Sequence, residues 1–85
     1  MTRYQYEMTH YAENAEMTIR VNDVRFLIDT LLDTIEMGDR VEVIDGFTGE
    51  ILCAQNCADP ILQEAFGLMV LGRAMEKSLG VSFND

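Results

Sequence analysis

The sequence predicts a small α+β domain in which two helices cover one face of a mostly antiparallel sheet. Two long segments have helical periodicity, three short segments alternate apolar and polar residues, and two of these short segments flank a glycine-bounded turn. The predicted order is strand, helix, strand, strand, helix, with further strands open at both ends. At 85 residues the chain is long enough for a single domain, residues 1–85.

The first strand is expected over residues 17–21, where apolar and polar residues alternate and β-branched side chains are well represented. The same alternation over residues 4–10 allows a strand, but a loose arm fits as well. Residues 1–15 are therefore expected to form either an N-terminal arm or an edge strand. At the other end, Val81 and Phe83 would either add an edge strand or simply pack.

A helix is predicted over residues 22–37, because apolar residues recur there with a period near 3.6. Asn22 or Asp23 would cap its start, and Gly38 would end it in the left-handed conformation. The apolar stripe expected to face the core comprises Val24, Leu27, Ile28, Leu31, Leu32 and Ile35.

Residues 40–45 and 50–54 read as two strands that flank a turn at residues 46–49. Glycines at both ends of this turn supply the backbone angles of a hairpin, so the two strands should pair antiparallel. Phe47 at the tip would either fold back on the core or contact a partner.

The second helix is predicted from Asp59, the N-cap, and Pro60 to residue 78 or 79, with Gly80 as its C-terminal stop. It is apolar almost all round, so it must be buried on more than one side. The stripe assigned to the core comprises Ile61, Ala65, Leu68, Gly72, Met75 and Leu79. The opposite side is assigned either to cover by the terminal segments or to a homodimer interface, formed by Phe66, Gly67, Val70 and Ala74.

Fifteen acidic residues against six basic ones give a formal charge of -9, which argues against direct binding to nucleic acid or to an anionic membrane. The chain has no apolar run of the ~18 residues that a membrane span needs. Residues 1–6 lack the apolar stretch of a signal peptide, so a cytoplasmic protein is expected.

Catalytic and metal-binding residues are scarce. Cys53 and Cys57 have a spacing that zinc pairs permit, but His10 is the only other soft ligand. His10 also matches no catalytic motif. We therefore expect two reduced thiols, no metal, no cofactor and no enzymatic activity.

The feature that points to function is acidic charge along the first helix and beyond it. This stripe is either an ordinary solvated face or a surface that imitates the charge spacing of nucleic acid and binds a basic groove on a protein. The acids predicted to bind such a partner are Asp29, Asp33, Glu36, Asp39 and Glu42, with Phe26, Met37 and Phe47 as apolar anchors.

The segments VNDVRFLID (residues 21–29) and GDRVEVIDGFTGEIL (residues 38–52) carry a resemblance over residues 17–54. They resemble small acidic proteins of bacteriophages and mobile elements in Gram-positive bacteria, in which a short helix precedes a V-x-V-x-D-x-x-T-G-E-x-L hairpin. The resemblance implies a strand–helix–hairpin fold without a catalytic group. It also implies, for several such proteins, anti-CRISPR inhibition of a host effector.

Two functions follow as hypotheses. The first is a phage-type inhibitor, anti-CRISPR or similar, that blocks a nucleic-acid-handling host protein through the acidic stripe. The alternative is a structural, assembly or homodimeric protein that uses the apolar second helix.

Overall fold

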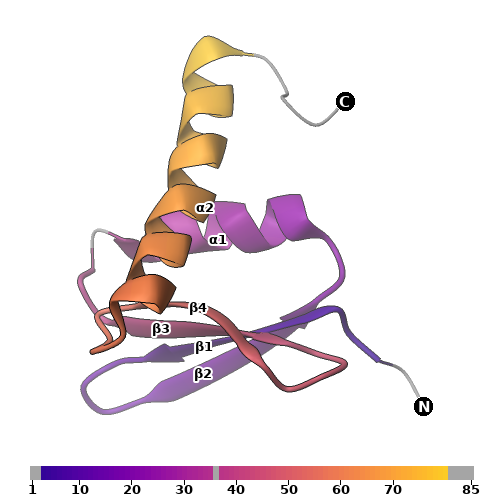
Figure 1. The fold of residues 1–85 in the computed structure, drawn as a ribbon, viewed down its shortest axis with the longest axis vertical. Coiled ribbons are helices and arrows are strands. Elements are labelled where there is room, and N and C mark those ends of the chain that lie inside the picture. The colour runs from indigo at the N-terminus through magenta and orange to yellow at the C-terminus, as the bar shows by residue number, and fades with distance from the viewer. Residues whose placement is uncertain (1–2, 36, 81–85) are drawn as a thin grey trace.

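A four-stranded antiparallel sheet forms one layer of the molecule, and two helices lie together on one of its faces (Figure 1). The computed structural model describes residues 3–35 and 37–80. Its elements in chain order are β1 (Tyr6–Tyr11), β2 (Glu16–Val21), α1 (Val24–Ile35), β3 (Arg40–Asp45), β4 (Ile51–Gln55) and α2 (Pro60–Leu79). The predicted α+β class, with its mostly antiparallel sheet and two helices, is confirmed.

The strand order in the sheet is β2-β1-β3-β4, which places the N-terminal strand in the interior. Met8 of β1 lies opposite Ile19 of β2 on one side and Val43 of β3 on the other. The expectation of an arm or an edge strand, made for residues 1–15, is therefore wrong for residues 6–11. The alternation within β1 was visible, but the pairing of β1 with β3 joins segments too far apart in the chain for local pattern to reveal.

The hydrophobic core lies between the sheet and the two helices. It is built by buried side chains from β1, α1, β3, β4 and α2, namely Met8, Leu27, Leu31, Val41, Val43, Cys53, Phe66 and Val70. The predicted core stripe of α1 is confirmed at Leu27 and Leu31, whereas Ile35 is 42% exposed at the end of the helix.

The helix boundaries follow the predicted capping residues. The carboxylate of Asp23 accepts a hydrogen bond from the Arg25 amide at 2.9 Å, and that of Asp59 accepts one from the Ile61 amide at 2.9 Å. Pro60 occupies the first turn of α2, and Gly80 ends the helix with a φ of 70°. The C-terminal segment that contains Val81 and Phe83 lies outside the described residues.

The face of α2 that packs on the core is the reverse of the prediction. Phe66 and Val70, assigned to a dimer interface, are only 2% and 4% exposed, while Leu68, assigned to the core, is 62% exposed. An apolar pattern that runs nearly all round a helix cannot select one side. Here the side is selected by polar residues of α2 that pair with α1, and hydrophobicity alone would place those residues in solvent.

The C-terminal end of α2 points away from the sheet, as the yellow end of the ribbon shows (Figure 1), while Arg73, Glu76 and Lys77 in this half of the helix still contact α1. The sheet and α1 therefore cover only part of this helix. None of the helices within the described ranges is long and apolar enough to cross a membrane.

The β3–β4 hairpin forms as predicted, and its turn is held by Asp45, the last residue of β3. The Asp45 carboxylate accepts hydrogen bonds from the amides of Phe47 at 2.8 Å and Thr48 at 3.1 Å. The next residue, Gly46, donates its amide to the Gln5 carbonyl at 2.9 Å, which ties the turn to the chain entering β1.

Replacement of Gly46 by alanine should destabilise the fold, because the new Cβ would lie 1.8 Å from the Tyr4 carbonyl oxygen. The backbone must move to relieve this clash, so we expect a loss of about 2 kcal/mol in the free energy of unfolding, measured by urea denaturation. Phe47→Ala changes an exposed residue of the same turn and should cost less than about 0.5 kcal/mol. Equal losses from the two variants would contradict the close approach at Gly46.

Candidate functional site

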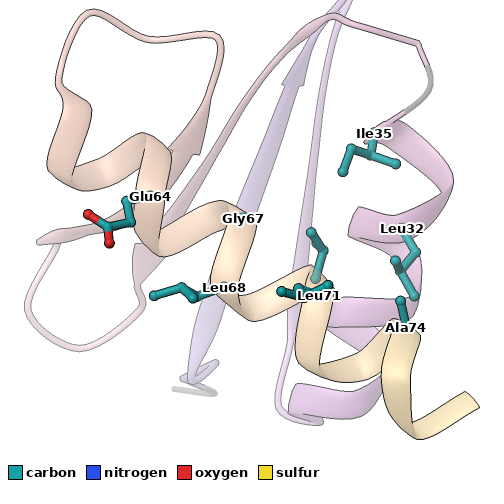
Figure 2. Close-up of a pocket in the computed structure, with 8 residues that line it drawn as sticks. Leu32, Ile35, Glu64, Gly67, Leu68, Leu71 and Ala74 are labelled. Atoms are coloured by element: carbon teal, nitrogen blue, oxygen red, sulfur yellow. The ribbon is translucent and has the colours of Figure 1, made fainter. Parts of the chain in front are cut away.

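An open apolar groove runs between α1 and α2 (Figure 2) and has a volume of about 640 Å³. Leu32 and Ile35 of α1 form one wall. The described residues of α2 that line it are Glu64, Gly67, Leu68, Val70, Leu71 and Ala74. Apart from Glu64, these residues are apolar, so the groove favours an apolar occupant.

Along one edge of the groove α2 presents a continuous exposed stripe, which we call the α2 seam. Its apolar members are Ile61, Leu68, Leu71, Met75 and Leu79, which are 75%, 62%, 55%, 48% and 63% exposed. With Glu64 between the first two, the spacings from Ile61 to Met75 are three, four, three and four residues, as in the contact positions of a heptad repeat, and Leu79 follows Met75 after four more residues on the same side of the helix. This spacing is typical of a helix surface that packs against another helix.

Two glycines of α2 leave its backbone accessible beside the seam. A Cβ placed on Gly67 or on Gly72 would meet no atom within 4 Å. Glycine in a helix interior costs roughly 0.8–1 kcal/mol relative to alanine, and the fold of one chain gains no packing from either residue in return. Bare backbone at these positions suits the close approach of a second helix.

An ionic cluster fixes α2 against α1 and thereby determines which side of α2 is exposed. Arg73 of α2 donates two hydrogen bonds to the carboxylate of Asp29 in α1, at 2.9 and 3.3 Å, and the ammonium of Lys77 lies 3.1 Å from the same carboxylate. The bidentate geometry restrains both position and rotation. These contacts hold the pKa of Asp29 below its usual range, chiefly through the hydrogen bonds from Arg73.

Glu76 completes this cluster from a buried position. Its side chain is 7% exposed and its Oε2 accepts hydrogen bonds from Arg73 at 3.0 Å and from Arg25 of α1 at 3.2 Å. A buried carboxylate is stable only when it is paired, so Glu76 requires α2 to keep this rotation.

The acids that the sequence assigned to a partner do not share one surface. Asp29 is engaged by α2, Asp33 is exposed on α1, and Glu36 lies outside the described residues. In the loop after α1, the Asp39 carboxylate forms a hydrogen bond with His10 Nε2 at 2.9 Å.

Glu42 lies on the opposite face of the sheet from the helices and is 8% exposed. Its carboxylate accepts hydrogen bonds from Arg40 and, at 3.2 Å, from the Tyr11 hydroxyl, and the Arg40 guanidinium lies 5.3 Å from the centre of the Tyr11 ring. Burial, followed by the neighbouring Glu42 carboxylate, raises the pKa of Tyr11. Glu42 is therefore satisfied within its own chain.

The three predicted apolar anchors are exposed but dispersed. Phe26, Met37 and Phe47 are 55%, 59% and 57% exposed. Phe47 lies beyond Asp45, at the end of the sheet where Asp45 pairs with Tyr6, whereas Met37 precedes Arg40 at the opposite end. Strands of six residues separate these two ends by roughly 17–20 Å.

Of the four residues predicted for a dimer interface, the structure exposes two. Ala74 and Gly67 line the groove and are exposed, while Phe66 and Val70 belong to the core of one chain. Sequence reasoning missed the surface role of Leu68, Leu71 and the other seam residues. Their spacing places them on one side of α2, but no signal in the sequence tells whether that side meets the core or solvent.

The two thiols and the histidine form no common centre. Cys53 is buried in the core, where desolvation raises its pKa to about 11, and Cys57 contacts the backbone carbonyls of Ala54 and Asp59. His10 is paired with Asp39. Among residues 3–35 and 37–80, no three side chains of the kinds that bind metals lie close enough to hold an ion.

Comparison with known proteins yields no family, no curated protein and no solved structure that matches this chain.

Asp29→Asn should lower stability at neutral pH, by about 0.5–1 kcal/mol because the carboxylate is a third exposed and partly screened. The depressed pKa means that the contribution of Asp29 is present above the ordinary aspartate value of about 3.9 and is lost as pH falls through the lower value of the folded state. Urea denaturation of both proteins should therefore show a difference that narrows below about pH 4. A difference independent of pH would contradict this pairing.

Alkylation should distinguish the two cysteines. In the native protein at pH 8 we expect iodoacetamide to modify Cys57 first, because Cys53 is buried and its raised pKa leaves little thiolate. Peptide mass mapping reports the site, and the same reaction in denaturant should modify both thiols. Equal rates of alkylation of the two thiols in the native protein would show that Cys53 is not held in the core.

Proposed function

We propose that the protein is a non-enzymatic binding module that holds an amphipathic helix in the groove between α1 and α2. The supporting observation is that the α2 seam exposes five large apolar side chains along one side of the helix, four of them at heptad spacing, beside an apolar groove. Recognition of this kind uses apolar anchors at helical intervals on the bound helix.

The apolar area is of the size that such binding needs. The exposed fractions of the five apolar seam residues together equal about three whole side chains, worth roughly 5–8 kcal/mol when buried. The apolar face of the bound helix contributes a similar amount, against an association cost of roughly 4–15 kcal/mol. The balance is compatible with a micromolar complex, which needs about 8 kcal/mol.

The inhibitor of a nucleic-acid-handling protein, of the anti-CRISPR kind, stays a separate prediction supported by the formal charge of -9. It depends on acids that meet a basic groove, so its binding should weaken sharply with added salt. Binding through the α2 seam is mainly apolar and should change little with salt. The geometry favours the seam, because Asp29 and Glu42 are already paired within the chain.

The test uses fluorescent amphipathic peptides with leucine at the heptad contact positions and lysine elsewhere. Wild-type protein should bind them in fluorescence anisotropy, and Leu68→Glu should weaken binding at least about tenfold by placing a charge in the apolar contact. Leu68 is 62% exposed, so this variant should keep its fold and circular-dichroism spectrum.

The matched control is Phe26→Glu, which adds the same charge at a side chain that is 55% exposed on α1 and does not line the groove. It should bind as the wild type does. If both glutamate variants weaken binding equally, or if a monomeric wild type binds no amphipathic helix, the proposed function fails. If either glutamate variant binds the lysine-containing peptide more tightly than the wild type does, the contact is purely electrostatic instead.

A further inference from the structure

We propose that the helix bound at the α2 seam is α2 of a second copy of this chain, packed antiparallel about a two-fold axis at the level of Val70. This inference rests on the proposed function, since it names the partner of the same surface. Three features of α2 support it: the symmetry of its exposed residues, the distribution of its charges, and its apolar area.

Two pairs of residues on α2 are placed symmetrically about Val70, whereas the positions that mirror Leu71 and Met75 are Met69 and Ala65, which pack against the core. Ile61 lies nine residues before Val70 and Leu79 lies nine residues after it, and both are largely exposed. Leu68 lies two residues before Val70, and Gly72 lies two residues after it. In an antiparallel pair, Leu68 of one copy therefore faces Gly72 of the other, and the symmetry repeats this contact.

This pairing matches a large side chain with an open space. Leu68 is 62% exposed, and no atom lies within 4 Å of the position that a Cβ on Gly72 would occupy. A two-fold interface requires one surface to be complementary to itself, and a leucine opposite a glycine on the same helix meets that requirement. A parallel pair would instead oppose leucine to leucine and leave the glycines facing each other.

The charges of α2 also favour the antiparallel arrangement. Its N-terminal end carries Asp59 and Glu64, whereas Arg73, Lys77 and Glu76 in its C-terminal half belong to the ionic cluster with α1. Antiparallel packing keeps the two acidic ends apart, and it opposes the two helix dipoles. Parallel packing would place the two acidic ends together.

The apolar area agrees with a small symmetric dimer. At roughly 30 Å² per apolar carbon, the exposed parts of the α2 seam and of Ile35 supply on the order of 400 Å² per copy. A standard interface buries about 800 Å² per partner, of which roughly 65% is apolar in homodimers. The seam and the groove wall thus provide most of the apolar surface that such a dimer needs.

The first experiment is sedimentation equilibrium of the wild type across the micromolar range. We expect a reversible dimer that tightens with added salt, because two copies of formal charge -9 repel each other outside the seam. Leu68→Glu and Gly72→Leu should each weaken self-association at least about tenfold, whereas Phe26→Glu should leave it unchanged. A dimer that survives both Leu68→Glu and Gly72→Leu would overturn the inference.

The second experiment reads the orientation by disulfide formation in a Cys57→Ser background. A Leu68→Cys protein mixed with a differently tagged Gly72→Cys protein should form crosslinked heterodimers on mild oxidation. The Leu68→Cys protein alone should form far fewer, because its two thiols lie apart in an antiparallel pair. Efficient crosslinking of Leu68→Cys to itself would indicate a parallel pair and overturn the proposed geometry.

Failure of this inference can be told from failure of the proposed function. A wild-type protein that stays monomeric and still binds the lysine-flanked helical peptides would retain the binding module and overturn the second copy as its partner. A monomer that binds no helical peptide would overturn both.

Discussion

The rotation of α2 about its own axis is the constraint on which the rest of the surface depends. Apolar residues surround this helix, so hydrophobic burial alone would tolerate several rotations. The bidentate contact of Arg73 with Asp29 and the buried Glu76 are satisfied in one rotation only. In that rotation Phe66 and Val70 face the core and the α2 seam faces solvent.

The same ionic cluster explains why a domain this small leaves so much apolar surface uncovered. The sheet and α1 occupy two sides of α2, and the C-terminal end of the helix extends beyond the sheet (Figure 1). A helix that is longer than the layer beneath it adds little stability to a single chain. Its protruding turns lack tertiary packing, and helical turns depend on such packing for their stability. A partner helix would supply that packing along the whole length of the seam.

The acidic residues serve different purposes in different places. Asp29 and Glu42 stabilise contacts within the chain, one between the helices and one on the open face of the sheet. The remaining negative charge acts as a field over the whole surface, which keeps an apolar-faced protein in solution and disfavours anionic partners. Such a field limits which partners approach, and under the proposed function the shape and apolarity of the groove would select among them.

Local sequence determined the elements whose cause lies within a few residues: both helices with their caps at Asp23 and Asp59, the hairpin at Asp45, and the α+β class. Tertiary structure alone decided that β1 lies inside the sheet and that Leu68 lies outside the core. The first depends on pairing between strands distant in the chain, and the second on ion pairs between α1 and α2. Neither leaves a periodic signal in the sequence, because periodicity reports which residues share a face and not which neighbour that face will meet.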